Sequence, residues 1–375
     1  MKIGIISESL NRPITGVENY VFNLIKELSN LGLKKKDVDI ELINYKKNKH
    51  FKDINEYIID NPFEKIFKTL WYPYAIYKLK ENKEFNVIHN TRHFPTIFKL
   101  KYSKYIITVL DIMPIVIPPN KYSIKKYFMY RALLPRTIKS ADKIIAISHH
   151  TKNDIIQHFK IPEDKIKVIH LAANKNYKPL QGDKINKIKQ KYDLNCPFIL
   201  YVGGLAPNKN VKRLIQAFYK LKKQGINHKL ILTGVKRWKY KSIFETIEKL
   251  NLQKDVIFTG YVPDEDLPAL YNAADLFVYP SLYEGFGLPP LEAMACGTPV
   301  ITSNTSSLPE VVGDAGIMVN PYDVDELANK MYEVLTNDGL GEELSKKGLE
   351  RAKLFSWKKC AEEHLKVYEE VYNMK

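Results

Sequence analysis

The sequence predicts an α/β protein with two domains, each built around a parallel sheet. Short apolar runs alternate with amphipathic helical patterns along nearly the whole chain, as βαβ units require. A chain of 375 residues, 45% of them hydrophobic, can also bury two cores of ordinary size. We expect a first domain over residues 1–175, a second over 190–355, and a last helix over 356–375.

The first domain is expected to begin with an apolar strand at 2–7. A loop with Gly16 follows, and then a helix over 18–31, which is the outline of a nucleotide-binding half. An amphipathic helix is expected after Phe63, where lysines lie between aromatic and aliphatic residues. Further strands are expected at 38–43, at 87–89, at 105–110 and in the run from Ala141, which we take as the last strand of this domain.

A basic segment runs from Lys99 to Lys139, with nine cations and a single acid, Asp111. From Ser123 onward its apolar residues have helical spacing, so we expect an amphipathic helix, kinked at Pro135. Its cationic face is either simply solvated or docks on an anionic membrane surface, where each cation contributes about 1 kcal/mol. The net charge of +16 favours an anionic partner, but arginine is scarce relative to lysine, so nucleic acid is not expected.

The second domain is expected to open with a strand at 198–202, a glycine loop that includes Gly204, and a helix over 211–223. Lys209 lies at the mouth of this loop. An ammonium group in that place can hold a diphosphate as a point charge.

The next two strands, at 229–233 and 256–259, are also followed by loops with polar residues. Arg237 lies after the first of them, at the sheet edge where open α/β proteins bind ligands. The acidic run 264–266 resembles a metal-binding DxD motif, but it precedes a helix, so we favour a capping role.

The most informative stretch begins at Asp275. It contains a strand at 276–279, a loop with Gly285 and Gly287, and a helix that starts at Pro289 and ends near Gly297. A glycine loop that leads into a helix N-terminus presents free N–H groups and a partial positive charge, which together bind anions.

Two carboxylates flank this anion site: Glu284 before the loop and Glu292 in the first turn of the helix. Carboxylates beside an anion site are unexpected if the ligand is only a phosphate. They are useful if the ligand also carries hydroxyl groups, because an ionised carboxylate is a pure acceptor of O–H donors. A nucleotide sugar carries both a diphosphate and the hydroxyls of its two sugars.

This stretch resembles the donor-site signature of the family 4 retaining glycosyltransferases, and the resemblance extends over nearly the whole chain. It implies the GT-B fold, in which two Rossmann-like domains face a central cleft and the last helix crosses back to the first domain. The mannosyltransferases of surface-polysaccharide and glycolipid assembly are the most similar branch. The resemblance therefore implies a nucleoside-diphosphate sugar as donor, GDP-mannose first, and a glycan or a lipid-linked acceptor.

The resemblance also implies a role for individual residues. Glu284 would face the donor sugar, Glu292 would bind the ribose, and the backbone after Gly260 would contact the nucleobase. The residues expected to bind the donor are Gly16, Gly204, Lys209, Arg237, Tyr261, Val262, Glu284, Gly285, Phe286, Gly287, Leu288 and Glu292. Those expected to be catalytic are Glu284, Lys209 and Asp111.

Two positions depart from the family pattern. Leu110 occupies the place of a histidine that often precedes Asp111, and Asp111 itself is either an acid that faces the site or a turn residue. Gly204 stands where the family often has an arginine. Neutralisation of the diphosphate then depends on Lys209 and the helix N-termini, with help from Lys236 or Arg237.

The expected reaction is hexose transfer with retention, with no obvious general base, so the leaving phosphate would accept the proton of the acceptor in a front-face mechanism. Three alternatives remain: a nucleotide-sugar epimerase of the same fold, a glycogen- or sucrose-type synthase, and a polyanion-binding protein without activity. No bound metal or cofactor is expected. Three scattered cysteines, the polar start of the chain and the lack of a long apolar run lead us to expect a cytoplasmic protein, peripheral on the inner face of the cell membrane.

Overall fold

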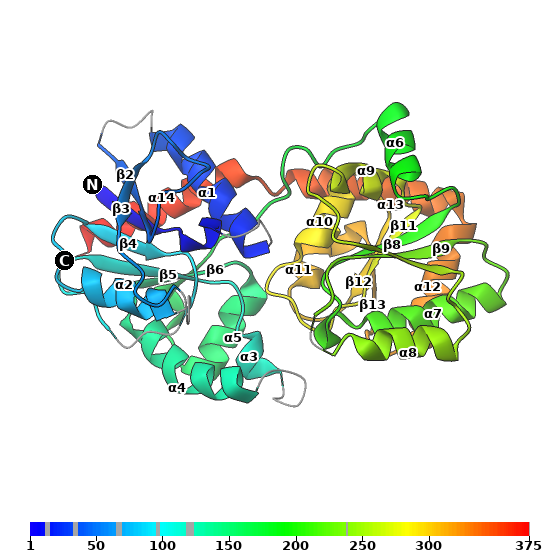
Figure 1. Ribbon diagram of the computed structural model, residues 1–375, viewed down its shortest axis with the longest axis horizontal. Helices are drawn as coiled ribbons and strands as arrows, with labels where there is room; N and C mark the ends of the chain where they lie inside the picture. The colour runs from blue at the N-terminus through cyan, green and yellow to red at the C-terminus, as the bar shows by residue number, and fades with distance from the viewer. Residues whose placement is uncertain are drawn as a thin grey trace. The chain divides into compact units, whose positions relative to one another are not determined.

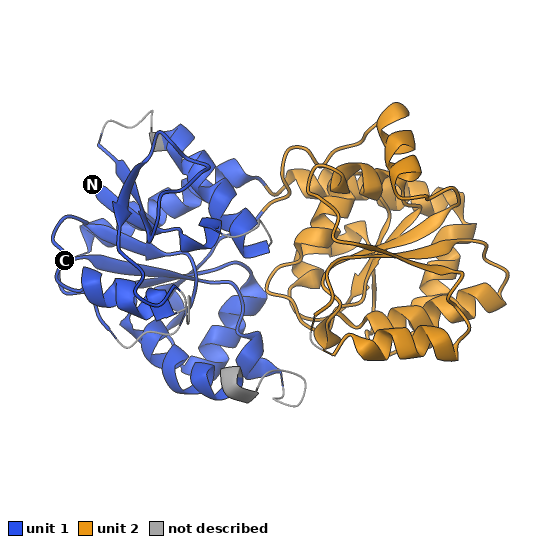
Figure 2. Cartoon of the chain, in the orientation of Figure 1, with its two compact units in different colours: residues 1–171, 356–375 blue, residues 172–355 orange. Residues whose placement is uncertain are grey.

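The computed structural model describes residues 1–11, 16–32, 37–64, 70–94, 98–117, 124–237 and 239–374. The chain forms two compact units (Figure 2). Unit 1 consists of residues Met1–Leu171 together with Ser356–Lys375, and unit 2 of residues Ala172–Phe355. The end of the chain therefore belongs to the same unit as its beginning.

Unit 1 is built on a seven-stranded sheet in the order β3-β2-β1-β4-β5-β6-β7. All of its neighbouring strands pair in parallel, which confirms the parallel sheet that the sequence predicts. Its strands are β1 Lys2–Ile6, β2 Asp39–Asn44, β3 Asn55–Ile58, β4 Val87–Asn90, β5 Lys104–Val109, β6 Lys143–Ala146 and β7 Ile166–Val168.

Two of these strands correct the sequence analysis. β3 was not predicted, because its four residues, Asn55–Ile58, are too few and do not alternate between apolar and polar side chains. β7 lies beyond β6, which was taken as the last strand of the domain. With three residues, β7 is too short to be recognised from periodicity.

Helices cover both faces of the first sheet (Figure 1). Successive side chains of β4 point to opposite faces of the sheet. Ile88 packs in an apolar cluster with residues of α2, α4 and α5 on one face. The next side chain, His89, contacts α14 on the other face. The helices of unit 1 are α1 Gly16–Gly32, α2 Trp71–Leu79, α3 Met113–Val116, α4 Ile124–Ser140, α5 His149–Phe159 and α14 Trp357–Asn373.

Hydrogen bonds between fully buried side chains attach α14 to the sheet. His364 Nδ1 lies 2.8 Å from the carbonyl oxygen of Cys360. Because a carbonyl only accepts, Nδ1 carries the proton and Nε2 is the acceptor. The hydroxyl of Tyr20 in α1, 2.9 Å away, must therefore donate to His364 Nε2.

The direction of the other hydrogen bonds follows from the donation by Tyr20. Having donated its proton, Tyr20 accepts from the hydroxyl of Thr108 at 2.9 Å. Thr108 then accepts from His89 Nε2 at 2.8 Å, so that His89 Nδ1 accepts from Tyr368 at 2.8 Å. All five side chains are neutral and each hydroxyl proton is used, which stabilises the packing of α14 on β4, β5 and α1.

Three predicted helices of unit 1 can be compared with the structure. α1 begins at Gly16, two residues before the predicted start. α4 contains Pro135, as predicted. The helix expected after Phe63 is observed only as α2, from Trp71, and residues 65–69 lie outside the described part of the chain.

Unit 2 is built on a six-stranded parallel sheet in the order β10-β9-β8-β11-β12-β13. Each predicted strand of this half is present, and β13 is added at the edge. The strands are β8 Phe198–Val202, β9 Lys229–Thr233, β10 Val256–Gly260, β11 Leu276–Tyr279, β12 Val300–Ser303 and β13 Ile317–Val319.

The helices of unit 2 also form two layers. α7, α8 and α12 lie along one face of the sheet and α9, α10 and α13 along the other (Figure 1). Their bounds, with those of α6 and α11, are α6 Asp183–Lys191, α7 Val211–Lys223, α8 Lys241–Lys249, α9 Leu267–Ala273, α10 Leu288–Ala295, α11 Leu308–Val312, α12 Val324–Thr336 and α13 Asp338–Lys353. Among the described residues, no helix has the length and apolar character needed to cross a bilayer.

Candidate donor site

Two loops at the carboxyl edge of the second sheet are joined through their backbones. Gly203 N–H donates to the carbonyl of Thr233 at 2.8 Å, and Leu205 N–H donates to that of Val235 at 3.0 Å. Gly234 has φ +141°, and a Cβ there would lie 2.1 Å from the carbonyl oxygen of Gly203. Only glycine allows the loops after β8 and β9 to approach this closely.

Lys209 ends a short 3-10 helix between β8 and α7, and its ammonium group reaches Glu284. Nζ lies 2.5 Å from Glu284 Oε1 and 2.8 Å from the hydroxyl of Tyr279. Ser281 Oγ donates to the same carboxylate oxygen at 2.6 Å. The two charged side chains are 20% and 13% exposed, so the pair is accessible at one side. The structure thus brings together two residues that the sequence analysis assigned to different parts of the donor, Glu284 to the sugar and Lys209 to the diphosphate.

The backbone of Glu284 is fixed by two serines that follow β12. Ser306 Oγ accepts from Glu284 N–H at 2.7 Å and donates to the carbonyl of Glu284 at 2.6 Å. Ser307 Oγ donates to the carbonyl of Phe286 at 2.5 Å. Ser306 has φ +61°, a conformation that is uncommon for a residue with a side chain, and these bonds hold it there.

The glycine loop leads into α10 as predicted. Gly287 precedes the helix with φ +125°, and Pro289 and Pro290 occupy its first turn. Within the described chain, no hydrogen bond joins the N–H group of Gly287 or Leu288 to another residue, so both can receive an anion. The expected donor roles of Gly285 and Phe286, which have other interactions, remain predictions.

Glu292 lies one position further along the helix than the sequence analysis placed it. α10 begins at Leu288, so Glu292 belongs to its second turn. The side chain is buried, and the hydroxyl of Tyr271 donates to its Oε2 at 3.1 Å. Burial raises the pKa of Glu292 to about 7, and nearby Asp264 adds to the effect, while hydrogen bonds from Tyr271 and Tyr177 lower it.

The segment expected to contact the nucleobase follows β10. Gly260 ends the strand with φ +71°, which turns the chain away from the sheet. Tyr261 is 56% exposed, whereas the side chain of Val262 is buried, so Val262 offers only its backbone. Their contact with the base remains a prediction.

Gly204 and Arg237 lie against each other. A Cβ on Gly204 would be 3.0 Å from Cγ of Arg237, so the stem of the arginine covers this glycine. The neighbouring cation, Lys236, lies over the ring of Phe244 at 5.0 Å. The role of Lys236 and Arg237 in neutralising a diphosphate remains a prediction.

The two candidates of unit 1, Gly16 and Asp111, follow β1 and β5, and β4 lies between these strands. Gly16 is the first residue of α1 rather than part of the preceding loop, which corrects its predicted place. Asp111 Oδ1 accepts from Met113 N–H at 2.9 Å at the start of α3, as a turn residue does, and its expected catalytic role remains a prediction. Leu110 N–H donates to Nδ1 of His93 at 3.3 Å, so a buried histidine that the sequence analysis did not single out lies beside the position that lacks one.

The acidic run 264–266 does not cap α9 as predicted. Asp266 holds the N-cap position, but its side chain makes no capping hydrogen bond. Its Oδ2 instead accepts from Lys191 Nζ at 2.6 Å and from the Tyr192 hydroxyl at 2.7 Å. The carboxylate thus connects α9 to α6, and the pKa of Asp266 is lowered by these hydrogen bonds against the opposing effect of burial.

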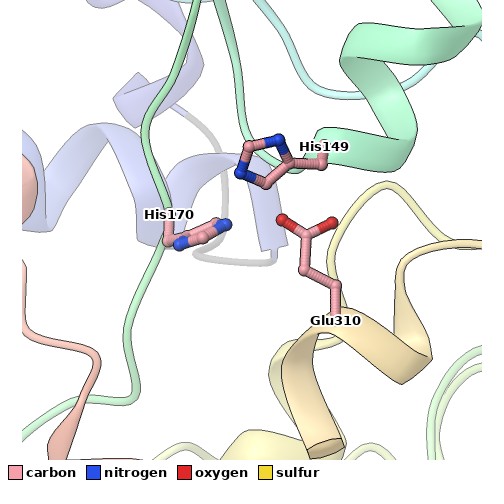
Figure 3. A group of neighbouring side chains, drawn as sticks. All are labelled: His149, His170 and Glu310. Carbon is pink, nitrogen blue, oxygen red and sulfur yellow. The ribbon is translucent and has the colours of Figure 1, made fainter.

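His149 and His170 lie close to each other in unit 1. Their ring centroids lie 5.9 Å apart, with the rings inclined by 62° (Figure 3). Glu310, also drawn in Figure 3, belongs to α11 of unit 2, so the three side chains do not form a site within either unit. We assign them no metal.

Comparisons with known proteins identify the family of the chain. A family model described as Glycosyltransferase Family 4 matches residues 14–176, and one described as Glycosyl transferases group 1 matches residues 183–351. The O-antigen chain mannosyltransferase B of Escherichia coli is 33% identical, over 98% of this chain and 99% of the relative. The chain belongs to the family 4 glycosyltransferases. This glycosyltransferase is an enzyme, as the sequence predicts, and the alternative of a binding protein without activity is wrong.

Other relatives match parts of the chain or only its fold. The O-antigen chain mannosyltransferase RfbU of Salmonella typhimurium is 35% identical, over 58% of this glycosyltransferase and 57% of the relative. A solved structure of Anabaena Alr3699/HepE in complex with UDP and glucose has a TM-score of 0.75 and 20% identity, with 99% of this chain and 100% of that chain covered. Sucrose-phosphate synthase from Thermosynechococcus elongatus has a TM-score of 0.76 and 21% identity, and covers 99% of both chains. The two-domain GT-B fold is confirmed.

Several residues that shape the donor site of this glycosyltransferase were missed. Tyr279 was interpreted only as the end of a strand, although its place at the carboxyl edge of the sheet was a usable signal. Tyr177 lies in a segment interpreted as a linker, and nothing in its surroundings pointed to Glu292. Ser306 and Ser307 support the backbone of Glu284 from the loop after β12, and no local pattern in the sequence pointed to these bonds.

Proposed function

We propose that this glycosyltransferase transfers mannose from a nucleoside-diphosphate mannose, GDP-mannose first, to a hydroxyl group of a glycan or lipid-linked acceptor in surface-polysaccharide assembly. The anomeric configuration of the sugar is retained. The proposal names a donor, an acceptor class and a stereochemical course that go beyond family membership.

One observation carries the donor class. At the carboxyl edge of the second sheet, the free N–H groups of Gly287 and Leu288 lie in the same loop as Glu284, which pairs with Lys209. The amides and the ammonium group suit a diphosphate, and the carboxylates of Glu284 and the buried Glu292 suit sugar hydroxyls. A ligand that carries only phosphate, or only sugar, would leave half of these groups without a partner.

The reaction requires the bond between the anomeric carbon and the diphosphate oxygen to break as positive charge develops on the sugar. Amides aimed at the diphosphate stabilise the leaving group. The acceptor oxygen then bonds to the same face of the anomeric carbon, and its proton passes to the leaving diphosphate. This front-face course needs no protein base.

Mannose and its polysaccharide context are supported by relatives. The Escherichia coli relative, which matches nearly the full length of this chain, is named as an O-antigen chain mannosyltransferase. The Serotype-specific mannosyltransferase WbdA of the same species is 37% identical over 59% of this chain and 28% of its own length. The solved structure with UDP and glucose supports a nucleotide sugar as the donor class.

A donor panel tests the proposal. We expect GDP-mannose to raise the melting temperature of the full chain more than UDP-glucose or a dTDP-sugar, because a ligand that binds the folded state stabilises it by mass action. With a mannan or lipid-linked acceptor, mannose transfer should follow, and Glu292→Ala should weaken donor binding. No stabilisation by any nucleotide sugar would overturn the donor class.

Two alternatives give different products in the same assay. A nucleotide-sugar epimerase would isomerise the donor with no acceptor present. A glycogen- or sucrose-type synthase would use a soluble acceptor, an alternative that the fold of sucrose-phosphate synthase keeps open. Either product in place of transfer to a polysaccharide or lipid-linked acceptor would replace the proposal.

We further propose that α4 docks on the cytoplasmic face of an anionic membrane, which would bring the enzyme to a lipid-linked acceptor. Phe128 is 63% exposed on this helix, and the cations Arg131, Arg136 and Lys139 are exposed as well. An exposed aromatic side chain among cations suits a headgroup region. Of the cations predicted for this surface, Lys121 and the side chains of Lys125 and Lys126 lie outside the described residues.

Sedimentation with vesicles tests this surface. The triple variant Arg131→Ala, Arg136→Ala, Lys139→Ala should lose most of its binding to phosphatidylglycerol vesicles, since about 1 kcal/mol is lost for each cation. The exposed Lys241 and Lys249 of α8 provide the control, because their replacement leaves α4 unchanged. Equal loss in both variants would indicate binding by net charge alone.

A further inference from the structure

We propose that Gly204 and Arg237 act as one unit, in which the guanidinium group of Arg237 supplies positive charge to the donor diphosphate in addition to the ammonium group of Lys209. The inference rests on the proposed function, because it names the side chain that neutralises the diphosphate at the same site. Its basis is the space around Gly204 and the charge balance of the two joined loops.

The space beside Gly204 is occupied by the arginine. Gly204 does not have a positive φ, so its backbone conformation does not require glycine. A Cβ at this position would lie 3.0 Å from Cγ and 3.5 Å from Nε of Arg237. The first of these distances is shorter than an ordinary van der Waals contact, so the glycine makes room for the stem of Arg237.

The backbone fixes the arginine in this place. Arg237 N–H donates to the carbonyl of Leu205 at 3.2 Å, and Leu205 pairs with Lys236 in a parallel bridge. Arg237 is therefore attached to the loop that contains Gly204, although it follows a different strand. Its side chain crosses that loop at the carboxyl edge of the sheet, where a ligand of this fold binds.

Lys209 and Lys236 have partners within the protein, so Arg237 is the cation of these loops that remains available to a phosphate. The ammonium group of Lys209 is paired with Glu284 at 2.5 Å, so a nearby carboxylate partly balances its charge. Lys236 lies over the rings of Tyr240 and Phe244. Arg237 is exposed, and no carboxylate of the described residues forms an ion pair with it. A guanidinium group also matches a phosphate with two parallel N–H donors.

Calorimetric titration of the full chain with GDP, GDP-mannose and guanosine tests the inference. We expect Arg237→Gln to weaken the binding of both diphosphates at least tenfold, while guanosine, which has no phosphate, binds unchanged. Arg237→Lys should recover only part of the loss, because an ammonium group lacks the planar fork. Lys241→Gln, which removes an exposed cation from α8, is the matched control and should change neither affinity.

Moving the arginine from one loop to the other separates the effect of its charge from the effect of its packing. Gly204→Arg in the wild-type background should weaken binding, because two arginine stems would compete for one space. The double variant Gly204→Arg, Arg237→Ala should bind GDP more tightly than Arg237→Ala alone, because the arginine now comes from the other loop. The double variant Gly204→Met, Arg237→Ala, which fills the same space without a charge, should give no such recovery, whereas a role in packing alone would let it recover as well.

The outcomes distinguish this inference from the proposed function. If the wild type binds GDP-mannose and Arg237→Gln binds it equally well, the inference is wrong and the proposed function stands. The inference is also wrong if the double variant is no better than Arg237→Ala. If the wild type binds no nucleoside diphosphate, the proposed function itself fails.

Discussion

The ammonium group of Lys209 lies 2.5 Å from Oε1 of Glu284, although the two residues are 75 positions apart and follow different strands. The two therefore depend on each other before any donor binds. We expect Lys209→Met to lower kcat/KM by about 10²–10³-fold, since it removes a preorganised positive charge from the leaving group. It should also weaken the binding of GDP, as measured by calorimetry.

The matched variant Glu284→Gln should behave differently. It retains a side chain of the same size but releases the ammonium group from its carboxylate, so GDP should bind as well as before or more tightly while turnover falls. Weaker binding of GDP in Glu284→Gln would show that the carboxylate contributes to diphosphate binding by positioning Lys209, and would contradict separate roles for the two side chains.

The buried carboxyl group of Glu292 should make donor binding depend on pH. With a pKa raised to about 7, it changes from neutral to ionised across the neutral range, and only the ionised form is a pure acceptor of ribose hydroxyls. We expect donor affinity to increase as the pH rises through about 7. Glu292→Gln should remove this dependence.

Tyr271 provides a second check on Glu292. Its hydrogen bond lowers the pKa of Glu292, so Tyr271→Phe should move the midpoint of the affinity profile to higher pH. The free energy of unfolding should depend on pH in the opposite direction to donor affinity. A carboxyl group whose pKa rises on folding from 4.5 to about 7 stabilises the fold at low pH and loses that contribution as the pH rises through this range. An unchanged midpoint in Tyr271→Phe would count against the assignment.

The buried hydrogen-bond chain of unit 1 should be sensitive to acid. Burial lowers the pKa of His364 from 6.5 to about 4, and that of His89 well below its usual value. A histidine that is neutral when folded stabilises the protein above pH 6.5, and this contribution is lost as the pH falls toward about 4. Urea unfolding at about pH 7.5 and about pH 5 should show the loss.

Substitution tests how much the same chain of hydrogen bonds contributes to stability. Thr108→Val removes both an acceptor and a donor from the middle, so we expect a cost of about 1–3 kcal/mol in the free energy of unfolding. Tyr102, which is 47% exposed, provides the control, and Tyr102→Phe should have almost no effect. Equal costs at the two positions would contradict a structural role for the chain.

Gly234 should not tolerate a side chain. A Cβ would lie 2.1 Å from the carbonyl oxygen of Gly203, so Gly234→Ala must separate the loops after β8 and β9. We expect a loss of about 2–4 kcal/mol in stability and weaker donor binding, measured by denaturation and calorimetry. A neutral Gly234→Ala would show that the loops can separate freely.

Gly341, within α13, is the control for this substitution. A Cβ there would meet no atom closer than 3.9 Å, so a methyl group can be added without displacing a neighbour. Gly341→Ala should stabilise the helix by about 0.5–1 kcal/mol.

Long periodic elements and glycine loops could be predicted from the sequence. The helix over 211–223 was placed at its observed bounds, and the helix after Gly287 began one residue earlier than predicted. Short elements were not found: β3 and β7 have four and three residues, so their pairing partners, rather than their own patterns, define them. The prediction that Asp266 caps α9 was wrong, because its carboxylate binds Lys191, which is far away in the sequence.

The sequence by itself determined the two parallel-sheet halves, the anion-binding helix N-terminus after Gly287, and the residue types of a donor site. These depend on local properties: hydrophobic period, the conformations open to glycine, and the missing N–H groups of proline. Only the tertiary structure decided that Lys209 pairs with Glu284, and that Arg237 covers Gly204. Such contacts form between residues that are distant in the chain, and strand order, which brings their loops to one sheet edge, cannot be inferred from any local pattern.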